Sequence, residues 1–249
     1  MLGYRVGYAS LASRNQGSSM ATVFSVRRKS FVAMCIVLTI LVAPVSGPIA
    51  INAEADSTIL ALDALKEFPV KGRAPKTGYS REAFGQAWSD VDRNGCDTRN
   101  DILKRDLRSV LFKPRTRDCV VLSGLLSDPY SGTEIPFLRG ETTSALVQID
   151  HVVSLSNAWQ TGAFQLSAKE RTALANDPLN LLAVKGSLNA QKGDGDAATW
   201  LPPNKSFRCE YVARQISVKK KYRLWVTVPE KNEMVRLLEK CPGQRAVIG

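Results

Sequence analysis

A single histidine occurs among the 249 residues of this chain, and its position makes it the first candidate for chemistry. His151 follows Asp150 at the end of residues 147–150, which read as a short strand. A neutral imidazole can take a proton from water near neutral pH, and a carboxylate can bind a metal ion. A lone histidine is more often a structural residue, so the case for a catalytic role of His151 depends on its neighbours in the sequence.

Two further groups of polar residues lie downstream. An apolar strand is predicted over residues 180–184 and begins Asn180-Leu181-Leu182. A short helix is predicted over residues 187–192, and its end reads Asn189-Ala190-Gln191-Lys192-Gly193. An asparagine amide oxygen is a suitable ligand for a hard divalent cation, and a lysine can bind a phosphate as a point charge.

The order D-H, then N-L, then N-x-x-K-G resembles the HNH nuclease family. The segments 92–99, 177–181, 186–189 and 200–203 are similar to the exported bacterial branch of that family, so the resemblance covers about residues 80–241. It implies an α+β fold with a ββα-metal core. In such a core a hairpin and a helix grip one divalent metal, and here further helices would surround them.

The resemblance implies a role for each of these polar residues. His151 would be the general base of phosphodiester hydrolysis, and Asn180 would brace the loop that orients it. Asp150 and Asn189 would bind one Mg²⁺ or Mn²⁺ ion. Asn189 stands where many family members have a histidine, which makes zinc less suitable. The implied activity is endonucleolytic cleavage of DNA, with RNA as a further substrate.

Simpler readings remain open at each position. Asp150 could cap a turn, Asn180 could be an ordinary residue at a strand edge, and Asn189 could cap a helix. At the level of function, the alternatives are a non-catalytic module that binds nucleic acid or wall polymer, and a phosphodiesterase that acts on another polyanion. The presence of one histidine argues against metallophosphatase sites built from several histidines.

The chain is basic, with a net charge of +11 and a pI of about 9.6. This balance favours a polyanionic partner, and nucleic acid, teichoic acid and an anionic membrane surface all satisfy it.

Residues 99–117 and 205–223 are two basic zones, which could equally be solvated faces. No base-reading element is apparent, so we expect little sequence specificity. The residues predicted to contact phosphate are Lys192, Arg99, Arg105, Arg208, Arg214 and Lys220. The oligomeric state is not predicted.

The N-terminus resembles a targeting segment. Arg27, Arg28 and Lys29 precede the apolar residues 31–45, and Ala53-Glu54-Ala55 fits a signal-peptidase site. We therefore predict a signal peptide over residues 1–55, an N-terminal helix and linker over 56–80, and the nuclease domain over 81–249. The protein would be secreted or held at the cell surface, without a stable membrane span in the mature chain. A retained membrane anchor is the alternative.

Four cysteines follow the predicted signal peptide. An even number of cysteines in an exported chain favours two disulfides, and three pairings are possible. We favour Cys96–Cys119 and Cys209–Cys241, because each closes a local loop. A zinc site is less favoured because the spacings are long and no C-x-x-C occurs.

The remaining pattern predicts mainly helices. They are expected over residues 57–68, 81–88, 101–110, 155–161 and 205–223, and from Ser167 and Pro229 onward. Strands are expected over residues 120–125 and 133–137, joined by a turn at 128–132.

Overall fold

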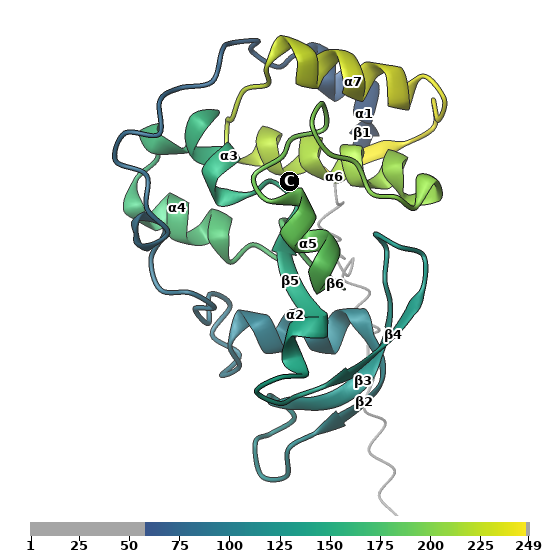
Figure 1. Ribbon diagram of the computed structural model, residues 1–249. Helices are drawn as coiled ribbons and strands as arrows, with labels where there is room; N and C mark the ends of the chain where they lie inside the picture. Colours follow the sequence, from purple (N-terminus) through teal and green to yellow (C-terminus); the bar gives the residue numbers. More distant parts are fainter. Residues whose placement is uncertain (1–57, 248–249) are drawn as a thin grey trace, which may run out of the picture. The chain divides into compact units, whose positions relative to one another are not determined.

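The computed structural model describes residues 58–247, which lie in one unit of the chain, residues 52–249 (Figure 1). The predicted signal peptide and its cleavage site lie outside the described residues. Within residues 58–247, no helix is both long enough and apolar enough to cross a membrane. The part that is described is a mixed α and β structure, and each of its sheets is antiparallel.

A two-stranded hairpin followed directly by a helix carries the candidate site residues. β5 (Val147–His151) pairs with β6 (Leu181–Lys185), so that His151 lies opposite Leu181. Four of the five residues of β6 are buried, which shows that neighbouring elements cover both faces of the strand. α5 (Gly186–Lys192) begins at the next residue. The three elements predicted over residues 147–150, 180–184 and 187–192 are therefore present in that order.

The start of α5 depends on a glycine. A Cβ atom on Gly186 would overlap the backbone carbonyl oxygen of Ala145 and crowd the side chain of Gln148. Ala145 belongs to η2 (Ser144–Leu146), the short turn that leads into β5. The absence of a side chain at Gly186 thus lets α5 begin close to the start of β5, which brings the helix alongside this strand.

A three-stranded sheet and a helix pack beside the hairpin. β2 (Leu107–Phe112), β3 (Val121–Ser127) and β4 (Glu134–Leu138) form the sheet in that order, and α2 (Thr98–Asp106) contacts β3, β5 and β6. α2 begins where the side chain of Asp97 accepts the backbone N–H of Asn100. The shared apolar core contains Ile102, Leu103, Leu107, Val121, Leu126, Phe137, Val147, Ile149, Leu181 and Ala183.

A second core forms around α6 (Arg208–Lys221), which follows η4 (Lys205–Phe207). α1 (Ala61–Lys66) and α7 (Val228–Leu238) pack on α6, as Figure 1 shows in its upper part. β1 (Thr58–Leu60) pairs with β7 (Arg245–Val247), so the first and last described strands lie side by side. The apolar residues of this core include Ala64, Leu65, Val212, Ile216, Met234 and Leu237.

The connection between β5 and β6 folds into a third cluster. It consists of α3 (Leu155–Gln160), η3 (Ala163–Gln165) and α4 (Ala168–Ala175). Ser167 and Glu170 form the predicted capping box at the start of α4. η1 (Glu82–Phe84) packs on α4, and the buried apolar residues of the cluster include Phe84, Trp159, Leu174, Val218 and Tyr222.

Both predicted disulfides are present. Cys96 is bonded to Cys119, and Cys209 is bonded to Cys241. The first links the loop before α2 to the loop before β3, and the second links the first turn of α6 to the residues that follow α7. The favoured pairing among the three possibilities is therefore confirmed.

Three of the predicted helices were wrong in extent. Residues 81–88 contain only η1, because Gly85 and Trp88 both have a positive φ, of 80° and 60°, which an α-helix does not allow. The helix predicted over 101–110 begins earlier, at the Asp97 cap, and gives way to β2 at Leu107. Residues 58–60 form β1 instead of the first turn of a helix, because they pair with β7.

Candidate active site

Asp150 and His151 are the last two residues of β5, and they face opposite sides of the hairpin, because successive side chains along a strand alternate. Asp150 lies on the side of α5 and is buried, whereas His151 is partly buried and lines a pocket. The side chains of Asp150, the candidate metal ligand, and His151, the candidate base, therefore lie on opposite faces at the end of β5.

Both carboxylate oxygens of Asp150 accept hydrogen bonds. The Tyr130 hydroxyl donates to Oδ2 at 2.5 Å, and the Lys192 ammonium donates to Oδ1 at 3.0 Å. Tyr130 is fully buried, and its pKa is raised well above its ordinary value by burial and by the negative charge of Asp150. The phenol therefore stays protonated and remains a donor to the carboxylate.

Lys192 is the counter-ion of Asp150. Its side chain is 0% exposed, and its Nζ also donates to the backbone carbonyl oxygen of His151 at 2.8 Å. A buried charge needs such partners, because desolvation of an unpaired ion is costly. The predicted contact of Lys192 with phosphate stays a prediction. What the structure gives is an ion pair that fixes both Asp150 and the backbone of the candidate base.

Asn189 lies three residues before Lys192 on α5, so both side chains face β5. Its Nδ2 donates to Gln148 Oε1 at 2.9 Å, and Gln148 lies on the same face of β5 as Asp150. The Oδ1 atom of Asn189 is left without a hydrogen-bond partner among residues 58–247. This free oxygen, on the Asp150 side of the strand, is available to a ligand.

The oxygens of Asp150 and Asn189 are of the type that Mg²⁺ and Mn²⁺ prefer, and binding of such an ion stays a prediction. A carboxylate has about four lone-pair sites, and each oxygen of Asp150 uses one, so Asp150 and Asn189 can each offer an oxygen. Mg²⁺ is commonly held by few protein oxygens and completed by water and phosphate. Within the described residues, no group of three or more His, Cys, Asp and Glu side chains could hold a metal.

Asn180 ties the segment after His151 to the neighbouring helix. Its side chain is fully buried, its Oδ1 accepts the N–H of Val153 at 2.8 Å, and its Nδ2 donates to the carbonyl oxygens of Val153 and Leu174. The backbone carbonyl of Asn180 accepts the N–H of Val152. These contacts are the ones that a bracing residue would make, and their effect on His151 stays a prediction.

The ring of His151 is oriented by two contacts. Nε2 lies 2.8 Å from the backbone carbonyl oxygen of Ala175, at the end of α4. Because a carbonyl oxygen only accepts, Nε2 carries the proton, and Nδ1 of the neutral ring keeps a free lone pair. The Trp88 ring stacks on the imidazole, with centroids 6.2 Å apart and planes inclined by 16°.

The pKa of His151 is lowered to about 4. Burial is the largest cause, and the positive charges of Arg81 and Lys192 act in the same direction, against the Ala175 hydrogen bond and the charge of Asp150. The imidazole is therefore neutral at physiological pH, which is the form that can accept a proton.

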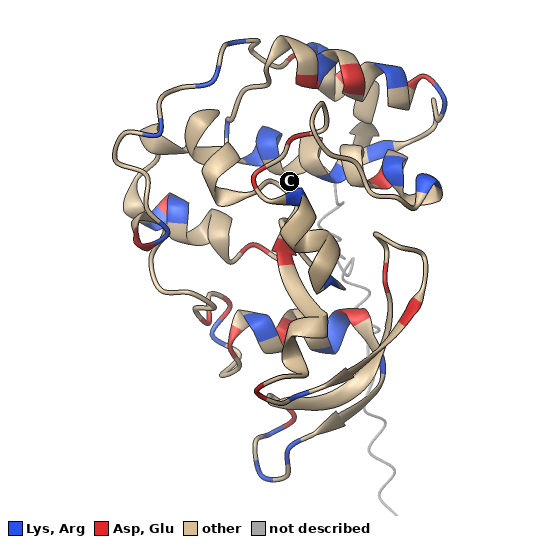
Figure 2. Ribbon diagram, viewed as in Figure 1, with Lys and Arg blue, Asp and Glu red and all other residues tan. Residues whose placement is uncertain are grey.

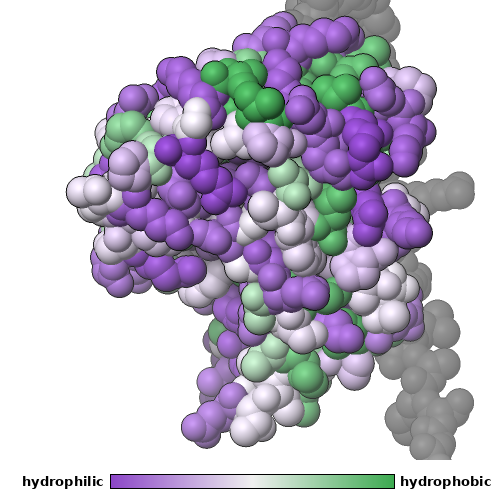
Figure 3. Space-filling model, turned by 45° about the horizontal axis from the view of Figure 1, so that its top comes forward, coloured by the Kyte–Doolittle hydropathy of each residue, from purple (hydrophilic) through white to green (hydrophobic). Residues whose placement is uncertain are grey.

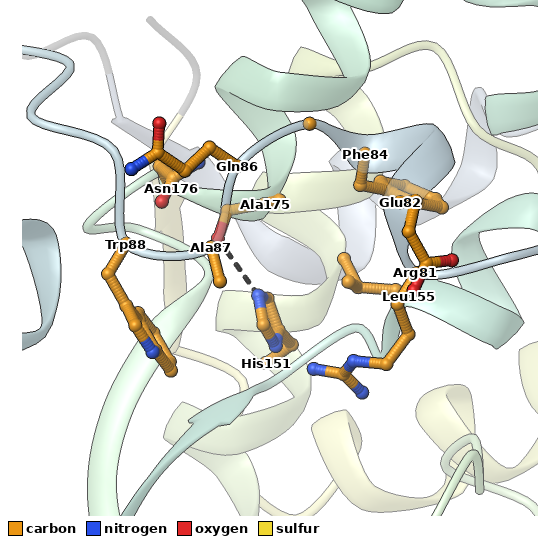
Figure 4. A pocket seen from close by; sticks show the side chains of 11 residues that line it. Arg81, Glu82, Phe84, Gln86, Ala87, Trp88, His151, Leu155, Ala175 and Asn176 are labelled. Atoms are coloured by element: carbon orange, nitrogen blue, oxygen red, sulfur yellow. Dashed lines mark hydrogen bonds between the residues drawn. The ribbon is translucent and has the colours of Figure 1, made fainter.

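A pocket of about 300 Å³ opens beside His151 (Figure 4). Of its lining residues, His151 is the one that was predicted from the sequence as a site residue, and those that were not include Arg81, Trp88 and Asn176. Arg81 and Trp88 come from a segment predicted to be a helix, and no local pattern pointed to their meeting a histidine so far along the chain. The full lining is Arg81, Glu82, Phe84, Gly85, Gln86, Ala87, Trp88, His151, Leu155, Ala175 and Asn176.

Residues 97–237 match the family described as "GmrSD restriction endonucleases, C-terminal domain". The chain belongs to this family. A relative, an uncharacterized secreted protein of Arthroderma benhamiae, is 35% identical over 214 residues, which cover 85% of this chain and 98% of the relative. No solved structure was found to match the chain. Membership of the GmrSD C-terminal-domain family confirms the broad prediction of a nuclease-type family.

The match to the GmrSD C-terminal domain contains Asp150, His151, Asn180 and Asn189. It begins at residue 97, after the segment that carries Arg81 and Trp88. One wall of the His151 pocket therefore comes from residues that precede the matched domain, and the candidate site draws on both parts of the unit.

The two basic zones lie on different elements. Residues 99–117 run through α2 and β2, whereas residues 205–223 lie on η4 and α6, and Figure 2 shows acidic residues interspersed among the basic ones along the ribbon. The face in Figure 3 is mostly hydrophilic, with small separate hydrophobic patches. The basic residues are thus distributed over several elements of the ribbon.

Several of the predicted phosphate contacts are engaged inside the protein. Arg105 and Arg214 both donate to the backbone carbonyls of Pro178 and Leu181, just before and within β6. Arg208 donates to the carbonyl of Pro202, and Lys220 pairs with Glu67. Burial lowers the pKa of Arg99, although it stays a cation. These contacts stabilise the fold, and binding of nucleic acid by these residues stays a prediction.

Proposed function

We propose that this protein hydrolyses phosphodiester bonds of nucleic acid, with His151 as the general base. The observation that carries the proposal is the hydrogen bond from Nε2 to Ala175. It leaves the Nδ1 lone pair free on a ring that is neutral at physiological pH. Family membership adds a nuclease-type context to this geometry.

In the proposed reaction, Nδ1 of His151 takes a proton from a water molecule whose oxygen attacks the phosphorus, the bond from phosphorus to the leaving ester oxygen breaks, and that oxygen takes up a proton from water. The Ala175 carbonyl keeps the tautomer fixed and accepts a hydrogen bond from the imidazolium that forms. The stacked Trp88 ring limits rotation of the imidazole. Asn180 holds the backbone at Val153, two residues after the base, so the loop cannot drift away from the strand end.

Asp150 and Asn189 would hold one Mg²⁺ or Mn²⁺ ion through their oxygens. A divalent cation there would stabilise negative charge on the scissile phosphate and on the leaving oxygen. Tyr130 and Lys192 keep the Asp150 carboxylate oriented through their hydrogen bonds. We thus assign to this chain an HNH-type division of labour, with the metal ligands and the base on opposite faces of one strand end.

We further propose that the protein acts outside the cytoplasm on DNA, and also on RNA, with little sequence preference. The two disulfides are typical of an oxidising compartment, and the relative from Arthroderma benhamiae is named a secreted protein. The positive net charge would favour polyanions of any sequence.

Cleavage of supercoiled plasmid tests this proposal. The oxidised protein is incubated with plasmid in Mg²⁺, Mn²⁺ or EDTA, beside His151→Ala and Lys169→Ala prepared in the same way. Lys169 is exposed on α4 and does not line the pocket, so its variant controls for purity and handling. We expect metal-dependent nicking by the wild type and the control, and a loss of at least about 10²-fold in His151→Ala.

Cleavage that persists in His151→Ala would remove His151 from the role of base. Cleavage in EDTA would remove the metal from the proposal. If neither DNA nor RNA is cut although both bind, the protein is a binding module and not a nuclease. A panel of other diesters would then detect a phosphodiesterase with a different substrate.

A further inference from the structure

Arg81 is a cation without a partner at the mouth of the candidate site. Its side chain makes no hydrogen bond or ion pair within residues 58–247. Other arginines near the site behave differently: Arg105 and Arg214 bind backbone carbonyls, and Arg73 pairs with Asp196 at 2.7 Å. An arginine that lines a pocket with all its donors free is suited to an incoming anion.

The position of Arg81 is fixed by the docking of η1 onto α4. Phe84 is buried, and the Arg171 guanidinium donates to the carbonyl oxygen of Ala83 at 2.7 Å. Gly85 has a φ of 80°, and a Cβ atom there would overlap the Thr172 side chain, so η1 can lie directly on the helix. The backbone beside Arg81 is therefore anchored, although its side chain is exposed.

The side chain of Arg81 extends toward His151. In Figure 4, Arg81 and Trp88 lie on either side of the imidazole. Trp88 has a φ of 60°, a conformation that costs a non-glycine residue about 1–3 kcal/mol and is found where the surroundings require it. The segment thus places a cation on one side of the candidate base and a flat ring on the other.

A second polar group in the same pocket also lacks a partner. Asn176 is 1% exposed and lines the pocket, and its Nδ2 donates to the carbonyl of Thr172. Its Oδ1 is buried without a hydrogen bond among the described residues. Buried polar atoms are usually satisfied, so a free acceptor here points to a pocket that is completed by a ligand.

We propose that Arg81 is a substrate-binding residue that holds the phosphate of the nucleic-acid strand against His151. This inference rests on the proposed nuclease function and deepens it. The guanidinium would donate two parallel hydrogen bonds to the non-bridging oxygens of one phosphodiester. The guanidinium would hold this phosphate on the His151 side of β5, where the pocket lies. The nucleoside next to this phosphate would occupy the pocket near Asn176.

Steady-state cleavage of a fluorescent oligonucleotide tests the inference in four proteins: wild type, Arg81→Ala, Arg81→Lys and Lys169→Ala. Lys169→Ala removes one positive charge outside the pocket, so it separates net charge from position. We expect kcat/KM to fall by about 10²-fold in Arg81→Ala. Arg81→Lys should recover part of this loss, because an ammonium keeps the charge without the bidentate geometry. The control should match the wild type.

Binding in the absence of cleavage gives a second measurement. Each substitution is combined with His151→Ala, and the affinity for the same oligonucleotide is measured from low to moderate salt. Loss of one phosphate contact should reduce the slope of log K against log salt by about one. A substitution that only disturbed the fold would not change the slope in this way, and the melting temperature of each variant checks for such a disturbance.

The outcomes separate the two proposals. If the wild type does not cleave any nucleic acid, the proposed function fails, and the inference fails with it. If the wild type cleaves and His151→Ala does not, but Arg81→Ala keeps its kcat/KM and its salt slope, the function stands and the inference about Arg81 is overturned.

Discussion

At the scale of single residues, one hydrogen bond determines what His151 can do. A histidine whose Nε2 faced solvent could carry its proton on either nitrogen, and part of its population would present the wrong atom. The Ala175 carbonyl removes that ambiguity, and burial together with nearby cations keeps the ring neutral. The sequence supplied the residue, but the tautomer is set by a carbonyl group 24 residues away, and the cations that help to lower the pKa, Arg81 and Lys192, are also distant in the sequence.

The lowered pKa of His151 predicts the acid limb of the pH profile. The neutral form is the active one, and it is lost only as the pH falls through about 4, so activity should persist well below pH 6.5. Measurement of kcat/KM from pH 3.5 to 8 at constant ionic strength would check this, with circular dichroism at each pH to confirm folding. An acid limb close to pH 6.5 would contradict the expectation and indicate a base that is more exposed than the structure shows.

At the scale of elements, the strands and helices that carry the site could be predicted because their signals are local. The Ser167–Glu170 capping box and the apolar runs at β5 and β6 are visible in the sequence itself. The segment 81–88 has a helical composition, yet it forms only η1. Its shape depends on Gly85 contacting Thr172 and on Arg171 reaching Ala83, and both contacts are tertiary. The sequence therefore did not predict that residues 81–88 line the His151 pocket, because it did not predict the shape of this segment.

The glycine at the start of α5 leads to a prediction about this element. In Gly186→Ala the added Cβ would overlap the Ala145 carbonyl, so α5 should shift away from β5 and carry Asn189 and Lys192 with it. We expect a loss of about 1–3 kcal/mol in the free energy of unfolding and a marked loss of activity. Chemical denaturation and plasmid nicking measure the two effects.

Gly72→Ala is the matched control for this substitution. A Cβ atom at Gly72 would have no heavy atom within 4 Å, and its backbone needs no positive φ. Equal stability of Gly186→Ala and Gly72→Ala would mean that the start of α5 tolerates a side chain, and the account of its position would be wrong.

At the scale of the whole molecule, covalent links complement three small apolar cores. The disulfides join residues 23 and 32 positions apart, and each connects elements that the cores alone would hold more loosely. The pairing was predictable from spacing because each bridge is local in sequence. The assembly of the cores was not predictable, because residues such as Phe84 and Tyr222 meet only after the chain has folded.

Removal of the Cys209–Cys241 disulfide tests whether the stability of the fold depends on this bridge. The double variant Cys209→Ser/Cys241→Ser should lose about 2–4 kcal/mol of stability, because the unfolded chain gains freedom. Thermal melting with and without reductant measures the effect. The melting temperature of the wild type should fall in reductant, and that of the variant should fall less. A wild type whose melting temperature is unchanged by complete reduction would show that the cores suffice alone.

The pairing of β1 with β7 has a consequence for how this protein is made. Synthesis runs from the first strand to the last, and Thr58 finds its partner only when Val247 has left the ribosome. The helices in between can form early, but the strand pair that closes their core forms only after β7 has been synthesised. A chain that stalls before β7 would present an unpaired β1 edge beside α1, and an exposed strand edge of this kind can pair with another chain.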